Sequence, residues 1–231
     1  CERQTDFVLS LLAEYGVHAT FFTLGRLAER HQALVKRVSA AGHELACHGH
    51  DHTMITRQQR DEFDVDVKRS KGLLEDLSGR EIEGYRAPTF SITRRTEWAL
   101  EVLLENGFHY VSSIYPIRHD RYGIPGAPRH PYVALMRDGR SLWEFPGPTV
   151  RVCRFTLPAA GGGYLRLFPY GWTRRAMLAT NREGGPVNVY AHPWEFRHYG
   201  GITKNAVKLR RLLGEFRFAP MGEVIAFISK K

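Results

Sequence analysis

The chain of 231 residues is 43% hydrophobic and 25% charged and carries a formal net charge of +9, which is ordinary for a globular protein with one large core. Its Lys and Arg residues are dispersed over predicted helices, which favours solvated helix faces over a nucleic-acid surface and leaves an anionic glycan or a membrane-proximal location open. No apolar stretch approaches the ~18 residues that a membrane-spanning helix needs, so no transmembrane segment is predicted.

The three cysteines are Cys1, Cys47 and Cys153, an odd count without CxxC spacing. This pattern indicates neither a disulfide framework nor a thiolate zinc site and favours a reducing compartment. We expect the bacterial cytoplasm in preference to the periplasm. No signal peptide is visible, but the chain opens at Cys1 and goes directly into a helical pattern, so we expect further residues upstream.

Hydrophobic periodicity in the first half of the chain predicts helices that alternate with short buried strands. In chain order the predicted elements are helix 5–15, strand 19–23, a helix ending at Gly42, strand 44–47, helix 58–77, strand 84–86, helix 93–106 and strand 110–112. Such alternation indicates right-handed crossover units around a parallel sheet, whose functional residues lie at the carboxyl ends of the strands. We therefore predict one α/β domain over residues 1–231, built as a closed or distorted barrel.

The stretch 113–140 interrupts this alternation, because its prolines and glycines disfavour regular structure. We interpret it as a long irregular loop that forms a wall on the substrate side. The remaining predicted elements are strands 142–145 and 150–155, a tight bend at 161–163, helix 173–182, strand 187–191 and helix 205–216.

The segment GHELACHGHDH contains four histidines close to a predicted strand. His48 and His52 are four residues apart, so one helical turn would direct both imidazoles at a divalent metal, with nitrogen ligands at ~2.0 to 2.1 Å. A bare HxxxH pattern is more often a surface feature, but its place at the end of a strand favours a metal site. We interpret His43 as a helix-end residue and His50 as lining the site.

Two further polar signals follow predicted strands. Arg86, in the sequence YRAP, can orient a catalytic carboxylate through bidentate hydrogen bonds while Pro88 fixes the backbone path, although a purely structural Arg is an equal alternative. His192, in the sequence YAHPWE, is either a general acid or a core histidine with satisfied hydrogen bonds. Three polar signals at three strand ends together favour an active site.

These segments resemble the motifs of the polysaccharide deacetylase family, also called NodB-like or carbohydrate esterase family 4, and the resemblance covers nearly the whole chain. ATFFTLG (19–25) is similar to the second-strand motif, GHELACHGHDH (42–52) to the HxxxH metal motif, YRAPTFS (85–91) to the RxP motif and YAHPWE (190–195) to the closing histidine motif. The segments RHDRYGIPGAPRHP, GGGY and HPWE further resemble a branch that is encoded with bacterial exopolysaccharide and exosortase loci.

The resemblance implies a distorted (β/α)7-type barrel of the NodB-homology kind, in which an Asp, His48 and His52 bind a divalent metal, with zinc expected. It also implies a second Asp as general base, Arg86 as the residue that positions this base, and His192 as the general acid. The implied reaction removes an N-acetyl group from a hexosamine unit of a bacterial exopolysaccharide or its precursor. The candidate substrate-binding residues are Tyr85, Pro88, Phe90 and Trp194, and packing is an equal alternative for the three aromatic side chains.

Two positions depart from the family pattern. The strand with both Asp residues should precede the first helix, and residues 1–5 leave no room for it, so we expect this strand upstream; Asp6 falls on the helix and is not a substitute. The usual acidic residue after Tyr110 is replaced by Val111, which puts in doubt the support that this position gives to the catalytic histidine. The alternatives are a relative that hydrolyses a ureide or cyclic imide, and a catalytically inactive glycan-binding homologue.

Overall fold

The computed structural model describes residues 2–196 and 203–230. The chain forms two compact units, and each unit combines segments that are distant in the sequence. Unit 1 contains Cys1–Ala19 and Pro148–Ala219, and unit 2 contains Thr20–Gly147 and Pro220–Lys231. The grouping of the whole chain into a single domain stays a prediction.

Unit 2 is built on a six-stranded sheet with the order β1-β2-β3-β4-β6-β5. The strands are β1 Thr20–Thr23, β2 Glu44–Cys47, β3 Gly84–Tyr85, β4 Tyr110–Val111, β5 Tyr132–Arg137 and β6 Arg140–Glu144. The first four strands and β6 run parallel, and β5 pairs antiparallel with β6. The carboxyl ends of five strands therefore lie along one edge of the sheet, the edge at which ligands bind in such folds.

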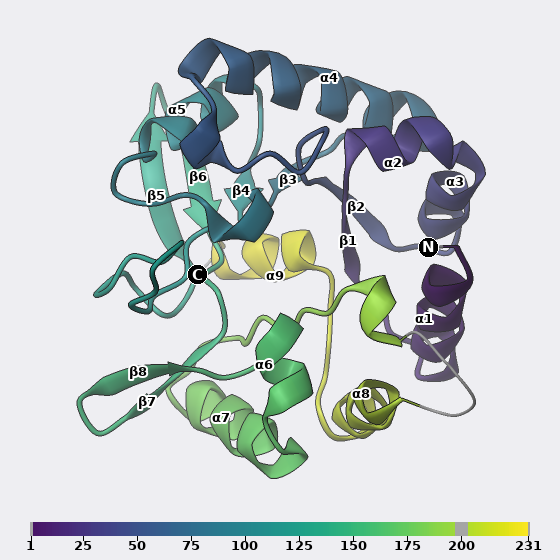
Figure 1. Cartoon of the computed structure of the whole chain (residues 1–231), viewed down its shortest axis with the longest axis vertical. Helices are drawn as coiled ribbons and strands as arrows, with labels where there is room; N and C mark the ends of the chain where they lie inside the picture. The colour runs from purple at the N-terminus through teal and green to yellow at the C-terminus, as the bar shows by residue number, and fades with distance from the viewer. Residues whose placement is uncertain (1, 197–202, 231) are drawn as a thin grey trace. The chain divides into compact units, whose positions relative to one another are not determined.

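Helices cover both faces of this sheet (Figure 1). The helical elements of unit 2 are α2 Gly25–Arg30, α3 Gln32–Ala40, η1 Ile55–Arg57, α4 Arg60–Ser78, η2 Pro88–Phe90, α5 Trp98–Glu105 and α9 Met221–Ile228. On the face covered by α4, the Phe63 ring lies 5.7 Å from the Tyr85 ring. On the opposite face, Met221 and Ile225 of α9 pack against Tyr110, which is the register partner of Gly84.

The α/β class and the crossover pattern predicted from the sequence are confirmed. Strand 44–47 coincides with β2, and helix 58–77 corresponds closely to α4. The predicted helix before Gly42 is confirmed as α3, and a short helix that was not predicted, α2, precedes it and is separated from it at His31. Closure of the sheet into a seven-stranded barrel stays a prediction, because in the described residues the sheet has edge strands β1 and β5.

The predicted irregular loop 113–140 is wrong at its carboxyl end. Residues after Pro131 form β5, which pairs with β6 through a two-residue turn at Asp138 and Gly139. Both turn residues have positive φ, at 53° and 74°, as the tight turn favoured by Asp-Gly requires. The segment from 112 to 131 is irregular, as predicted, and its place as a substrate-side wall stays a prediction.

Unit 1 combines a hairpin with helices. Its elements are α1 Glu2–Glu14, β7 Thr149–Val152, β8 Phe155–Pro158, α6 Gly162–Leu167, α7 Tyr170–Arg182, η3 Pro193–Phe196 and α8 Lys204–Glu215. The predicted strand 150–155 is confirmed only as far as Val152, the end of β7, because Cys153 has a φ of 53° and the chain reverses there into β8. The predicted strand 187–191 has no partner strand among the described residues, although Val187, Val189 and Ala191 pack on one apolar cluster with the alternation of a strand.

None of the helices in the described part of the chain combines the length and apolar content needed to cross a membrane.

Gly84 and Gly72 provide a matched test of this packing within unit 2. A Cβ at Gly84 would lie 2.2 Å from the Tyr110 ring, whereas a Cβ at Gly72, inside α4, would meet nothing within 4 Å. We expect Gly84→Ala to lower the free energy of unfolding by about 1–3 kcal/mol, because the core is overpacked. Gly72→Ala should raise it by about 0.5–1 kcal/mol, because Ala favours the helix. Urea unfolding measures both, and equal effects of the two changes would contradict this account.

Candidate functional site

His48 lies directly after β2 and is held by the backbone after β3. Its Nδ1 is 2.7 Å from the carbonyl oxygen of Arg86. A carbonyl only accepts hydrogen bonds, so Nδ1 carries the proton and Nε2 of the neutral imidazole carries the lone pair that a metal requires. The His52 ring lies 5.0 Å from the His48 ring, centroid to centroid. The structure thus brings together the two predicted metal ligands.

The predicted helical turn between these histidines is wrong. Residues 48–54 form a loop, in which Gly49 has a φ of 74° and His52 a φ of 61°. Left-handed residues change the direction of the chain within this loop, so the two rings meet without a helical turn. Among the described residues, no group of three or more His, Cys, Asp or Glu side chains is arranged to hold a metal.

The other two histidines of the segment lie elsewhere. His43 follows α3, as predicted for a helix-end residue, and its buried ring lies 5.0 Å from the Phe21 ring. The prediction that His50 lines the site is wrong, since its backbone N–H donates to the Asp66 carboxylate of α4. The His50 Nε2 is 3.7 Å from a carboxylate oxygen of Glu29 in α2, so the buried ring faces the helices.

Arg86 is buried where β3 ends. Its Nε donates to the carbonyl oxygen of Ser112 at 3.1 Å, and its guanidinium also donates to the Ser112 hydroxyl at 2.8 Å. The guanidinium carbon lies 4.1 Å from the centre of the Phe22 ring, a cation–π contact. These bonds fix the orientation of the guanidinium, but the positioning of a catalytic carboxylate by Arg86 stays a prediction.

The sequence analysis missed Glu144, the last residue of β6. Its side chain is fully buried, and its carboxylate accepts the backbone N–H groups of Ser113 and Ile114, each at 3.0 Å. Burial raises the pKa of Glu144 to about 8, and the two backbone donors and the charge of Arg86 only partly oppose this shift. The available signal was a single acidic residue inside the apolar strand sequence LWEF.

The candidate substrate-binding residues of unit 2 are mostly core residues. Tyr85 is fully buried, 5.7 Å from the Phe108 ring, so the packing alternative holds for this side chain. Pro88 is buried as well. Phe90 is 7% exposed and packs against Tyr115. Both Thr89 and Phe90 have positive φ, an uncommon backbone that concentrates at functional sites.

His192 and Trp194 belong to unit 1. Trp194 is 64% exposed, and its ring stacks on the His192 ring with a centroid distance of 4.2 Å and an interplanar angle of 14°. The backbone N–H of His192 donates to Glu195 at 2.9 Å. An exposed aromatic ring beside a half-buried imidazole is compatible with a sugar-binding surface, and the general-acid role of His192 stays a prediction.

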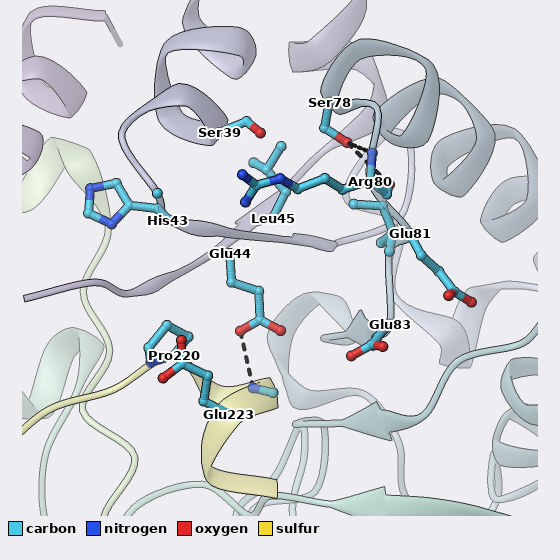
Figure 2. A pocket seen from close by; sticks show the side chains of 13 residues that line it. Ser39, His43, Glu44, Leu45, Ser78, Arg80, Glu81, Glu83, Pro220 and Glu223 are labelled. Atoms are coloured by element: carbon cyan, nitrogen blue, oxygen red, sulfur yellow. Dashed lines mark hydrogen bonds between the residues drawn. The ribbon is translucent and has the colours of Figure 1, made fainter. Parts of the chain in front are cut away.

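A pocket of about 220 Å³ opens at the other end of the strands (Figure 2). It is lined by residues that precede or begin β2 and β3 and by the start of α9, among them His43, Glu44, Arg80, Glu83 and Glu223. The Glu44 carboxylate accepts the backbone N–H of Gly222 at 3.1 Å and the Tyr110 hydroxyl at 2.7 Å. It therefore caps α9. Because chemistry in parallel sheets lies at the carboxyl ends, we do not assign the active site to this pocket.

The buried Glu144 makes a specific prediction about pH. Since its folded pKa of about 8 lies above its ordinary value of 4.5, the folded state retains the proton, and the resulting stability is complete below about pH 4.5 and lost by about pH 8. We expect the free energy of unfolding of the natural chain to fall, relative to Glu144→Gln, by up to about 1.4 kcal/mol per pH unit in this window. Urea unfolding at several pH values tests this, and a pH-independent difference would contradict it.

Comparison with known proteins identifies two consecutive regions. Residues 2–111 match the family model described as Polysaccharide deacetylase, and residues 112–226 match the Domain of unknown function (DUF3473). A peptidoglycan deacetylase of Helicobacter pylori is 35% identical over 108 residues, which are 46% of this chain and 36% of that protein. A peptidoglycan-N-acetylglucosamine deacetylase of Bacillus cereus is 31% identical over 98 residues, which are 42% of this chain and 36% of that protein. The chain thus spans about a third of the length of these relatives.

Solved structures share the fold over nearly the whole chain. A Mycobacterium smegmatis protein assigned to the polysaccharide deacetylases matches with a TM-score of 0.69 and 24% identity. The match covers 98% of this chain and 77% of the Mycobacterium chain. A pseudoenzyme of carbohydrate esterase family 4 from Bacillus anthracis has a TM-score of 0.59 and 12% identity, with 96% and 60% covered. At these identities the similarity establishes the fold alone.

Proposed function

Because residues 2–111 belong to the polysaccharide deacetylase family, we propose that the protein is a metal-dependent hydrolase that removes N-acetyl groups from hexosamine units of a bacterial exopolysaccharide or its precursor. The observation that carries the proposal is the His48 and His52 pair, with the His48 proton held on Nδ1 by the Arg86 carbonyl. The Helicobacter and Bacillus relatives are named as deacetylases of peptidoglycan, another polymer with N-acetylated hexosamines.

The donor set fits two ligands of a divalent metal such as zinc. Metal-binding histidines commonly donate their second ring N–H to a carbonyl or carboxylate, and the bond from His48 to Arg86 has this form. When bound, the metal supplies positive charge that polarises a carbonyl oxygen and acidifies water. His48 and His52, which follow the carboxyl end of β2, would hold this metal.

The proton transfers of the reaction require two residues of this chain, Arg86 and His192, and aspartates from a strand outside the described sheet. One aspartate acts as the general base and takes a proton from the water molecule that attacks the acetamide carbonyl. The Arg86 guanidinium holds the carboxylate of this aspartate in place. His192 donates a proton to the departing amine, and Trp194 offers an exposed ring for sugar stacking. We propose that both aspartates come from a strand that pairs with β1, the edge strand beside β2 in the described sheet.

A catalytically inactive glycan-binding protein is the second candidate. It is favoured by one observation, namely that the described residues bring no third ligand to His48 and His52. An assay for acetate release separates the two candidates.

Single substitutions in the full-length natural protein test the site. We expect His48→Ala and His52→Ala each to abolish binding of stoichiometric zinc, because each removes a nitrogen ligand. His192→Ala should retain zinc and lower kcat by about 10²–10⁴, the usual contribution of a general acid. Zinc content by atomic absorption and kcat on N-acetylated oligosaccharides measure these effects. His43→Ala is the control, since His43 packs against Phe21; unchanged zinc in both ligand variants would reject the assignment.

The substrate class is tested with the same preparation. We expect acetate and a free amine from N-acetylated hexosamine oligomers, and no ring opening of small cyclic imides or hydrolysis of ureides. Enzymatic acetate detection and imide absorbance follow the two reactions. Imide or ureide hydrolysis without acetate release would replace the proposed activity with that of a relative acting on another C–N bond, and binding of oligomers with neither reaction would favour the inactive homologue.

A further inference from the structure

Glu144 fixes the segment that follows β4. Its carboxyl oxygen accepts the backbone N–H groups of both Ser113 and Ile114 at 3.0 Å, and the side chain has no exposed surface. A buried carboxyl group with two backbone donors is costly to remove, because the donors would lose their partner away from water. The position of the backbone at residues 113 and 114 therefore depends on the last residue of β6.

The segment fixed by Glu144 in turn holds Arg86 and the residue after it. The Ser112 carbonyl and hydroxyl accept two hydrogen bonds from the guanidinium, at 3.1 and 2.8 Å. The Ser113 hydroxyl accepts the backbone N–H of Ala87 at 2.9 Å. Both the side chain of Arg86 and the backbone that follows it are thus bonded to residues 112 and 113.

Arg86 then holds His48. The backbone N–H of Arg86 donates to the Cys47 carbonyl at 2.9 Å, and the Arg86 carbonyl accepts the His48 Nδ1 proton at 2.7 Å. A displacement of the backbone at residue 86 would therefore move the acceptor that selects the imidazole tautomer.

From this series of contacts across β6, β4, β3 and β2, we propose that Glu144 is a positioning residue of the His48 site: it holds the 112–114 segment, which holds Arg86, whose carbonyl orients the His48 imidazole. The catalytic importance of this arrangement rests on the proposed function, but the orientation of His48 does not.

Glu44 provides a matched control for a merely structural role. It is also a carboxylate in unit 2, and it also joins two elements by accepting a backbone N–H, that of Gly222. It lies at the amino end of β2, however, whereas His48 follows the carboxyl end. Loss of either carboxylate should lower thermal stability, but only loss of Glu144 should affect His48.

The experiment compares Glu144→Ala, Glu144→Gln and Glu44→Ala in the full-length natural protein, with zinc affinity measured by chelator competition. We expect Glu144→Ala to weaken zinc binding about tenfold, the lower end for outer partners of metal ligands, and Glu144→Gln to stay within about twofold, because its amide oxygen accepts the same N–H groups. Glu44→Ala should lower the melting temperature and leave zinc affinity unchanged. Equal losses of affinity in Glu144→Ala and Glu44→Ala, or no loss in either, would overturn the proposal.

A second measurement separates this proposal from the proposed function. Nitrogen-15 NMR of the metal-free protein reports the His48 tautomer directly. We expect the Nδ1-protonated form in the natural chain and in Glu144→Gln, and a mixture of tautomers in Glu144→Ala. If the natural protein binds no zinc, the proposed function fails while this tautomer change still supports the positioning role. An unchanged tautomer in Glu144→Ala overturns it. Where Glu144→Ala does not fold, Glu144→Asp, whose carboxyl group is one methylene farther from the Ser113 and Ile114 N–H groups, provides the same readouts.

Discussion

The hydrogen bond from His48 Nδ1 to the Arg86 carbonyl exists because β2 and β3 are parallel neighbours, with Cys47 opposite Tyr85. In a parallel pair, residues that follow paired positions emerge at the same edge of the sheet. His48 and Arg86 are the two residues that follow this pair. The imidazole of His48 therefore meets the backbone carbonyl of a residue 38 positions later in the chain, and the local chemistry of the site depends on strand register.

The opposite end of the sheet has a different function in the fold. There Thr20 donates to the Glu44 carboxylate and accepts the backbone N–H of Met221, so the first turn of α9 is bonded to β1 and β2. These bonds satisfy N–H groups that a helix start otherwise leaves without partners. A carboxylate thus serves the fold at one end of the strands, and another, Glu144, lies beside the candidate site at the other end.

Hydrophobic periodicity and turn residues in the sequence correctly predicted the helices and strands whose formation depends on neighbouring residues. The apolar run at β2, bounded by Gly42, and the long amphipathic helix α4 are examples. The His48 and His52 pair was predicted with the wrong backbone, because a four-residue spacing does not distinguish a helical turn from a loop with left-handed residues. The β5–β6 hairpin was missed because the prolines before residue 132 outweighed the Asp-Gly turn signal. The burial of Glu144 was indicated only by its place in the apolar sequence LWEF, because the contacts that bury it depend on β6 pairing with β4, although β5 lies between these two strands in the sequence.

The chain crosses between its two compact units at Ala19, Gly147 and Ala219, and this has a consequence for its synthesis on the ribosome. The apolar face formed by Phe22, Tyr110 and Phe145 is covered by α9, which begins at Met221. Unit 2 therefore cannot complete its core until α9 has left the exit tunnel, although its sheet is fully translated by Glu144. For that interval of about 80 residues, or roughly 4–16 s at ordinary translation rates, the nascent chain exposes an aromatic surface that chaperones would recognise.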